Sequence, residues 1–304
     1  MKKIKLILLS ILFALTSCKT QDSYKLTIVS PSGAPAIAIA DLAYNHKEEY
    51  NFELNKTPEI LQATFLGNQE DVIIAPINMG ATMYNKNGNY LLASTLTWGN
   101  LYFASRLENF TLETMNNKEV IFFGANTINQ YVVDKVLEHN SIVPSNKVFL
   151  ETTALTQGQL IAKEDSIVLI AEPALSVAKT KVQGITSISV QDLYKDMTNG
   201  DSYPQAGCFV RKQTVIDHKS KIDSFISALE ESSNKTSTDT ETIAQYAEEL
   251  EFGGKKPILI NAIPNCNIKF VSATDSKLQI NSLFVNATQY CGGKLPDDNF
   301  YYQK

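Results

Sequence analysis

Polar side chains gather just after the predicted strands of this 304-residue chain, where they could hold a small solute. They are mainly hydroxyls and amides, accompanied by two rings and a single charge, that of Glu172. Hydroxyls and amides form hydrogen bonds as donors and acceptors, whereas rings stack on flat solutes. The sequence therefore predicts a ligand-binding site, whose candidate residues are Ser32, Gly33, Pro76, Asn78, Thr97, Trp98, Asn126, Thr127, Thr153, Glu172 and Tyr203.

Patterns typical of catalytic and metal sites are missing from the sequence. The histidines, His46, His139 and His218, stand apart, and no cysteine or histidine lies near them at the spacing of metal ligands. No Gly-x-Ser-x-Gly motif occurs. Neither Gly253-Gly254-Lys255 nor Gly292-Gly293-Lys294 has the spacing of a phosphate-binding loop. We therefore expect no catalytic residue, no metal and no cofactor.

Three features among the candidates also have a purely structural interpretation. Trp98, the only tryptophan, suits the wall of a cleft as well as the core behind a hinge. Glu172 could bind a ligand or could cap the helix that begins at Pro173, because acidic side chains stabilise helix N-termini. Ser32-Gly33 could bring backbone close to a ligand or could form an ordinary turn. The sequence leaves all three open.

The composition of these loops bears on the charge of the ligand. Several of them lead into helices, whose free N–H groups suit a carboxylate, a sulfonate or a phosphate. No arginine or lysine joins them, so a strongly anionic ligand lacks its usual partner. A small, flat, neutral or weakly cationic solute such as a substituted pyrimidine fits better, because it could stack on Trp98 or Tyr203 and donate a hydrogen bond to Glu172.

The elements that position these residues alternate between strands and helices, which predicts an α/β fold with parallel-rich mixed sheets. Residues 71–106 indicate a buried strand, a short helix and a long strand that breaks at Gly99 before a further strand. We interpret this break as a hinge between two lobes. We expect the strand Gln205–Arg211 to carry the chain back across the hinge beside Leu101–Arg106.

Six segments carry a resemblance to a known family, in order along almost all of the chain after its first residues. They are SPSGAPAIAIADLA (Ser30–Ala43), APINMGATMYNK (Ala75–Lys86), TLTWGNLYFAS (Thr95–Ser105), LIAEPALSVAK (Leu169–Lys179), YPQAGCFV (Tyr203–Val210) and GGKLPDDNFYY (Gly292–Tyr302). These segments resemble extracytoplasmic solute-binding proteins of ABC importers, in the branch that binds thiamine pyrimidines, sulfonates, taurine and nitrate.

This resemblance implies a two-lobe, periplasmic-binding-protein-like fold of type II with a hinge of two crossing strands. Lobe 1 would hold residues 24–100 and 208–304, and lobe 2 would hold residues 101–207. It also implies a monomer that binds a small molecule between closing lobes and delivers it to ABC permease subunits. The architecture equally resembles menaquinone-pathway enzymes and pyrimidine-forming thiamine enzymes, so an enzyme is one alternative and a binder of sulfonates or other anions is another.

The N-terminus has the pattern of a secretory signal, because three lysines precede an apolar run from Leu6 to Leu15. A helix needs about 20 apolar residues to span a membrane, and this run is shorter. It ends in Leu15-Thr16-Ser17-Cys18, which resembles the lipobox of bacterial lipoproteins. We expect residues 1–17 to be a signal peptide, Cys18 to carry lipid and residues 18–23 to tether the protein to the outside of the bacterial cell membrane.

The net charge limits the classes of partner, and the number of cysteines bears on disulfide formation. The formal net charge is −5, and removing a lysine-rich signal makes it more negative, which argues against nucleic acid as a partner. Cys208, Cys266 and Cys291 remain after Cys18, an odd number for an exported protein. The sequence leaves undecided whether Cys266 and Cys291 form a disulfide. Cys208 suits a buried position in an apolar strand.

Replacing Cys18 by Ser tests the predicted lipid anchor. The variant lacks the thiol that would carry lipid, so it should move from the membrane fraction to the soluble fraction of cells that express the full chain. Immunoblots of the two fractions measure the change. Partitioning equal to that of the unchanged protein would contradict the anchor.

Overall fold

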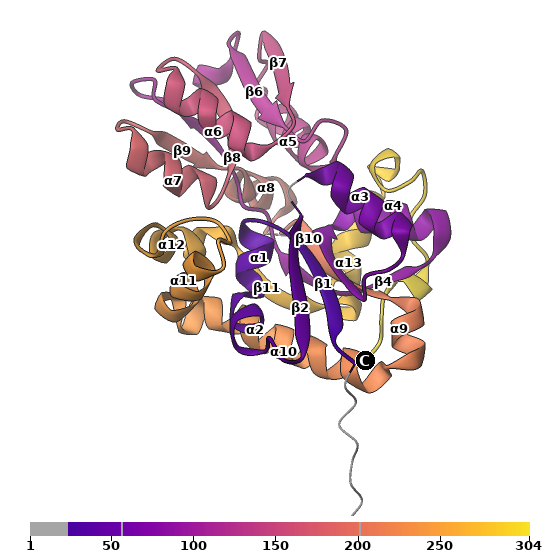
Figure 1. The fold of residues 1–304 in the computed structure, drawn as a ribbon. Coiled ribbons are helices and arrows are strands. Elements are labelled where there is room, and N and C mark those ends of the chain that lie inside the picture. Colours follow the sequence, from indigo (N-terminus) through magenta and orange to yellow (C-terminus); the bar gives the residue numbers. More distant parts are fainter. Residues whose placement is uncertain (1–23, 56, 201) are drawn as a thin grey trace, which may run out of the picture.

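The computed structural model describes residues 24–55, 57–200 and 202–304, so the predicted signal peptide, the tether and Cys18 lie outside the described residues. Two lobes, each built around one mixed sheet, stand one above the other in Figure 1. This arrangement confirms the predicted two-lobe α/β architecture. None of the described helices combines the length and apolar content that a membrane-spanning helix requires.

The sheet of lobe 1 has six strands in the order β11-β4-β10-β3-β1-β2. β1 pairs in parallel with β2 and with β3, while β10 runs antiparallel between β3 and β4, and β11 runs antiparallel beside β4. The strands are β1 (Leu26–Pro31), β2 (Tyr50–Asn55), β3 (Val72–Pro76), β4 (Tyr90–Thr97), β10 (Ala206–Arg211) and β11 (Ile268–Ser272).

Helices cover both faces of this sheet, which explains why its central strands are apolar on both sides. Along β10, Phe209 packs into the core on one face and Cys208 into the core on the other, as alternation along a strand requires. The helices of this lobe are α1 (Ala34–Ala38), α2 (Ala40–Asn45), α3 (Pro58–Gly67), α4 (Ile77–Asn87), α9 (Lys212–Asp217), α10 (Lys219–Thr238), α11 (Thr240–Glu249), α12 (Lys256–Ala262) and α13 (Ala273–Phe284).

The sheet of lobe 2 has five strands in the order β7-β6-β8-β5-β9. β6 is parallel to β7 and β8, and β5 is antiparallel to β8 and β9. Phe103 and Phe122 pack on one face, whereas their chain neighbours Ala104 and Ile121 pack on the other. The elements are β5 (Leu101–Ser105), β6 (Glu119–Phe123), α5 (Ile128–His139), β7 (Asn146–Leu150), α6 (Thr153–Ala162), β8 (Ile167–Ala171), α7 (Ala174–Lys181), β9 (Thr186–Ser189) and α8 (Val190–Thr198).

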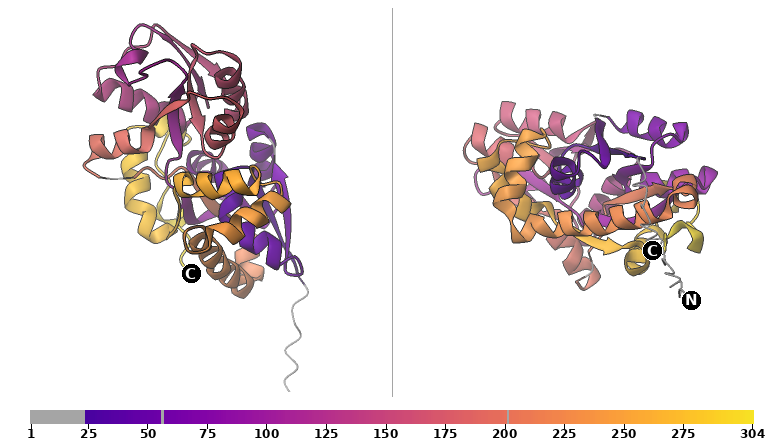
Figure 2. Two further views of the ribbon diagram at one scale, coloured as in Figure 1. Left: turned by 90° about the vertical axis from the view of Figure 1, so that its left-hand side faces the viewer. Right: turned by 60° about the horizontal axis from the view of Figure 1, so that its bottom comes forward.

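Short 3-10 helices complete the two lobes: η1 (Glu113–Met115), η2 (Ile263–Cys266), η3 (Thr288–Tyr290) and η4 (Asp298–Phe300). From α9 onward the chain stays on lobe 1, and the C-terminal segment packs against that lobe in every view (Figures 1 and 2). Tyr301 forms a bridge to Leu92 of β4 there. The first sheet is therefore assembled from two parts of the chain that are far apart in sequence.

The chain passes between the sheets twice. It leaves lobe 1 after β4 and enters β5 within a few residues, at the break predicted at Gly99. The return passage ends in β10, but this strand lies between β3 and β4, so the expectation that Gln205–Arg211 runs beside Leu101–Arg106 is wrong. The physical reason is that β10 supplies central apolar residues to the sheet of lobe 1, whereas β5 is already paired on both sides.

Hydrogen bonds from backbone and side-chain groups fasten the two passages. The Gln205 N–H donates to the carbonyl of Thr97 at 2.9 Å, and the Asn100 N–H donates to Oε1 of Gln205 at 2.9 Å. The Asn267 side chain donates to the carbonyl of Gly99. The predicted hinge is thus a pair of chain segments joined side by side.

All three described cysteines are free and buried, so the pairing of Cys266 with Cys291 left open by the sequence is not formed. The Cys291 thiol donates instead to the carbonyls of Thr288 and Lys294, at 3.5 and 3.3 Å. Cys208 occupies the apolar strand position that the sequence predicted.

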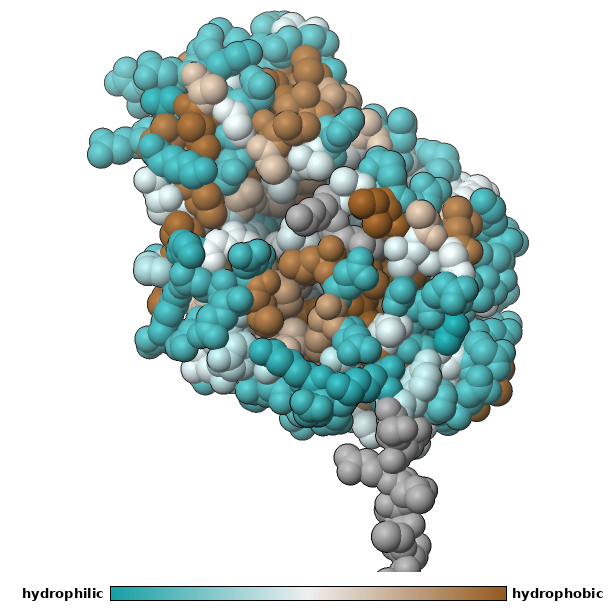
Figure 3. Space-filling model, viewed as in Figure 1, coloured by the Kyte–Doolittle hydropathy of each residue, from teal (hydrophilic) through white to brown (hydrophobic). Residues whose placement is uncertain are grey.

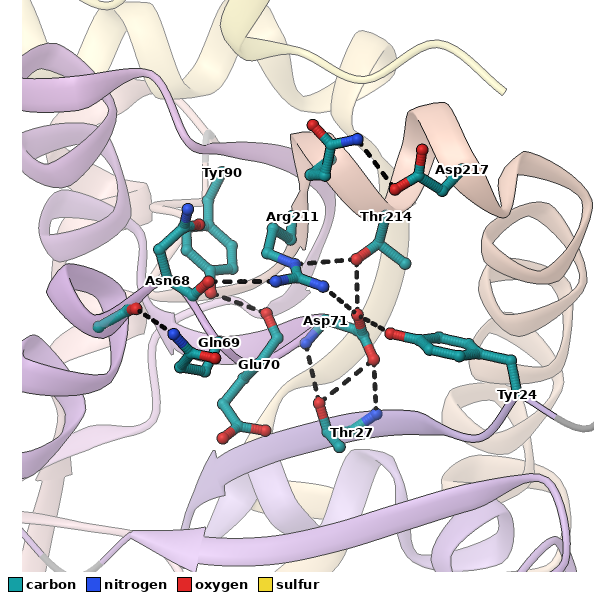
Figure 4. A network of polar contacts seen from close by, with 12 residues as sticks. Tyr24, Thr27, Asn68, Gln69, Glu70, Asp71, Tyr90, Arg211, Thr214 and Asp217 are labelled. Carbon is teal, nitrogen blue, oxygen red and sulfur yellow. Dashed lines mark hydrogen bonds and ion pairs between the residues drawn. The ribbon is translucent and has the colours of Figure 1, made fainter.

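A buried carboxylate ties the beginning of the described chain to the sheet of lobe 1 (Figure 4). Asp71, whose side chain is 2% exposed, pairs with Arg211 at 3.1 Å. It also accepts hydrogen bonds from the Tyr24 hydroxyl at 2.8 Å, from Thr27 and from Thr214. Because a buried charge is costly unless it is paired and hydrogen-bonded, this network makes β1, β3 and β10 depend on one another.

Replacing Asp71 by Asn should therefore destabilise the protein by about 3 to 5 kcal/mol, because it leaves Arg211 without its ionic partner in a buried setting. The midpoint of urea unfolding of the purified full chain measures this loss. Asp298→Asn is the matched control, since the exposed pair of Asp298 with Lys277 should contribute only about 0 to 1 kcal/mol. Equal shifts in the two variants would contradict the assigned role of Asp71.

Candidate ligand-binding site

A cavity of about 460 Å³ lies between the lobes, against the crossing segments. Its wall in lobe 1 comes from the loops after β1 and β3, and its wall in lobe 2 comes from the ends of β6, β7 and β8. In the space-filling view the surface is hollowed between the lobes, and apolar residues gather around this hollow (Figure 3). A concave, mostly apolar site at strand ends is where α/β proteins hold small ligands.

Most of the residues predicted from the sequence meet at this cavity. Loops that are far apart in the chain converge because the strands before them end at the same edge of their sheets. The predicted residues that line the cavity are Ser32, Gly33, Pro76, Asn78, Thr97, Thr127, Thr153 and Glu172. Their contact with a ligand stays a prediction.

The two predicted rings do not line the cavity. Tyr203 is fully buried and packs edge-on against Tyr194 with ring centroids 5.0 Å apart, and burial raises its pKa. Trp98 lines a different cavity, and its indole N–H donates to the carbonyl of Lys269 at 2.9 Å. The stacking role expected for both is therefore wrong for this cavity. The direction of the side chains explains why Trp98 does not line the cleft. Thr97 faces the cleft, and the next residue of the extended chain, Trp98, points to the opposite side.

Phe123 is the aromatic residue that the cavity presents, and the sequence analysis missed it. It is the last residue of β6 and stands half-buried just before Gly124. The signal that could have found it is an aromatic residue at a strand end directly before a glycine loop. Other lining residues that were not among the candidates include Met79, Asn100, Asn129, Glu151, Gln157 and Gln205.

Asn126 also lies outside the cavity lining, contrary to expectation. It is exposed and has a φ of 56°, a left-handed conformation that asparagine adopts more readily than most residues. Its backbone N–H donates to Oε1 of Gln130 at 2.8 Å. Asn126 therefore shapes the loop, and Asn129, the second residue of the following helix, lines the cavity.

Two amide oxygens at the cavity are buried without a hydrogen-bond partner among the described residues. They belong to Asn78, which is 8% exposed, and Asn100, which is 5% exposed. The orientation of the Asn100 amide is fixed, because its N–H group donates to the carbonyl of Glu172 at 3.0 Å. Since an unpaired buried acceptor is costly, both oxygens suit a ligand that brings N–H or O–H donors.

Glu172 combines the two roles that the sequence left open. It is 4% exposed and lines the cavity, while its two carboxylate oxygens accept from the Ser176 N–H at 3.0 Å and from the Ser176 hydroxyl at 2.9 Å. Burial raises the pKa of Glu172, and the Ser176 hydrogen bonds and the Lys179 charge lower it in part. The carboxylate is therefore a helix cap that still has lone pairs to offer a ligand.

The charge of the cavity is acidic. Among the described lining residues the charged ones are Glu172 and the exposed Glu151, and none is a lysine, an arginine or a histidine. Two helix N-termini near the cavity are capped by side chains. Thr127 accepts from the N–H of Asn129 at 3.3 Å and Thr152 from that of Leu155 at 3.4 Å. The N-termini of α1 and α4, at Gly33 and Pro76, have no side-chain cap.

The chain is similar in structure to proteins of ABC transport systems. A crystal structure titled as an ABC transporter from Parabacteroides distasonis aligns with 92% of this chain and 99% of its own, at a TM-score of 0.79 and 20% identity. The ligand-binding component of an ABC-type import system from Staphylococcus aureus, solved with zinc bound, aligns with 91% of this chain and 96% of its own, at a TM-score of 0.69 and 12% identity.

The periplasmic aliphatic sulphonate binding protein of Escherichia coli is a further neighbour, with a TM-score of 0.67, 11% identity and 92% coverage of both chains. No protein-family model and no curated protein matches the sequence. The likeness confirms the periplasmic-binding-protein fold of type II that the sequence resemblance implied, and at these identities it leaves the ligand open. Within the described residues no group of three or more His, Cys, Asp and Glu side chains could hold a metal ion.

Replacing Ser176 by Ala should raise the pKa of Glu172 further, because it removes the hydroxyl that donates to the ionised carboxylate. An NMR titration of the glutamate side-chain carboxyl carbons measures the shift. Thr180→Ala is the matched control, since its hydroxyl lies on the same helix and donates to the carbonyl of Val177. An unchanged Glu172 titration in Ser176→Ala would contradict the described contact.

Proposed function

We propose that this chain is the solute-binding component of an ABC importer, which holds its ligand between two lobes that close about the crossing segments. The observation that carries this proposal is the cavity itself: it is lined by both lobes and by the hinge, so a ligand that fills it bridges them. Bridging contacts stabilise a closed arrangement in proteins of this architecture. Permease subunits that accept the closed form are the expected partners.

The site suits a small, flat, neutral or weakly cationic solute that carries N–H donors, such as an aminopyrimidine. The site offers several hydrogen-bond acceptors to such a solute. They are the unpaired side-chain oxygens of Asn78 and Asn100 and the carboxylate of Glu172. Phe123 supplies an aromatic surface for stacking, in place of the two rings predicted from sequence. A stacked ring adds about 0.5 to 1.5 kcal/mol beyond the burial of its area.

A sulfonate or another strong anion is the second candidate, and the neighbour from Escherichia coli is titled as a sulphonate binder. The chemistry of the cavity argues against it here. The described lining contains two carboxylates and no cationic side chain, and the N-termini of α5, α6 and α7 already donate to side chains of the protein. An anion would lose hydration without gaining a charge partner.

An enzyme on the same fold is the remaining alternative. Catalysis would need a nucleophile or a general base poised beside the ligand. Glu172 is the buried acid of the cavity, but Ser176 engages both of its oxygens in capping. The lipobox-like start around Cys18 also favours a receptor that is anchored outside the cytoplasm by lipid, and we include this anchor in the proposal.

Replacing Glu172 by Gln should weaken binding of 4-aminopyrimidine by about 1.5 to 3 kcal/mol, the contribution of a hydrogen bond to a charged group. Isothermal titration calorimetry on the purified full chain measures the affinity, with ethanesulfonate titrated in parallel. Unchanged protein should bind 4-aminopyrimidine more tightly than ethanesulfonate.

Glu151→Gln is the matched control for this experiment. It makes the same change of charge at an exposed position of the same cavity, where solvent screens the interaction, so the affinity should change much less. Tight binding of ethanesulfonate that is indifferent to Glu172 would show that the proposed ligand chemistry is wrong.

A further inference from the structure

A further cavity lies behind the crossing segments, and we call it the back cavity. Its volume is about 650 Å³, and Trp98, Gln191, Lys195, Ser202, Lys269 and Gln279 are among the residues that line it. It shares no lining residue with the cleft. Gln191 and Lys195 belong to α8 of lobe 2, Lys269 and Gln279 to β11 and α13 of lobe 1, and Trp98 to the hinge. Both lobes therefore contribute to it.

The described lining of the back cavity differs in charge from that of the cleft. Of the described residues that line it, Lys195 and Lys269 are cationic and none is acidic. Neither lysine forms an ion pair with a described residue. Two ammonium groups at one concave site attract a carboxylate or a comparable small anion.

Buried acceptors at the same site call for hydrogen-bond donors as well as negative charge. Gln191 is 2% exposed, and its N–H group donates to the Ser202 hydroxyl at 2.8 Å, while its side-chain oxygen has no described partner. The side-chain oxygen of Gln279 is likewise buried and unpaired. Such orphan oxygens are uncommon, because each costs free energy unless a ligand or water satisfies it.

We propose that the back cavity is a second binding site, which takes a small acid that also carries hydroxyl or amino groups, as sugar acids and hydroxy acids do. Its carboxylate pairs with Lys195 and Lys269, and its donors reach the side-chain oxygens of Gln191 and Gln279. The site is built from side chains of lobe 1, lobe 2 and the hinge, and its volume falls in the range of pockets that hold small molecules.

Trp98 provides a direct readout, because it is the only tryptophan of the chain and it lines this cavity. Titrating the purified full chain with gluconate should shift the tryptophan emission in a saturable way. Hexanoate has the charge without the hydroxyls, and sorbitol has the hydroxyls without the charge, so both should leave the emission unchanged. The experiment requires no cleft ligand and stands independently of the proposed transport function.

Lys195→Met and Lys269→Met should each weaken gluconate binding about tenfold, since each removes one charge-assisted contact. Lys163→Met is the matched control, because Lys163 is an exposed lysine of lobe 2 that lines neither cavity, and it should bind gluconate like the unchanged protein. Gluconate affinity that is the same in all three variants, or equal emission shifts with hexanoate or sorbitol, would overturn the proposal.

Discussion

The structure depends on one constraint: a single chain must pass between two sheets twice and leave no buried backbone group unpaired at the passage. The two crossing segments satisfy each other's polar groups, because Thr97 and Asn100 on one passage form hydrogen bonds with Gln205 on the other. Gly99 turns the first passage with a φ of 71°, and a Cβ there would come within 2.3 Å of the Gln191 side chain. No other residue type fits such a place without moving its neighbours.

The position of the cleft follows from these crossings. Each lobe directs the carboxyl ends of its parallel strands toward the other lobe, so loops with unpaired polar groups face one another across the hinge. Asn100 belongs to the crossing itself, bonds to the Glu172 backbone in both directions and lines the cavity, while its side-chain oxygen is buried without a described partner. The crossing segments thus form part of the cavity wall, so a ligand held in the cavity would contact them directly.

Sequence patterns predicted elements and loops well, because hydrophobic periodicity and strand-end signals are local properties. The break predicted at Gly99 lies between β4, which ends at Thr97, and β5, which begins at Leu101. Patterns could not decide side-chain direction at the crossings, where one step along the chain separates Thr97 in the cleft from Trp98 behind it. They also misplaced Gln205–Arg211, since strand pairing depends on long-range packing between β3 and β4 that no local window contains.

The cleft and the back cavity lie on opposite faces of the crossing chain and have opposite charge: Thr97 and Gln205 line the acidic cleft, whereas Trp98 and Ser202 line the cationic cavity. If the cleft closes by rotation about the crossings, the space behind them widens. A solute held by Lys195 of one lobe and Lys269 of the other would therefore oppose closure around a cleft ligand. Because coupling between two sites is reciprocal, a closed cleft would release that solute to the same degree, and the hinge would convert occupancy of one site into affinity at the other.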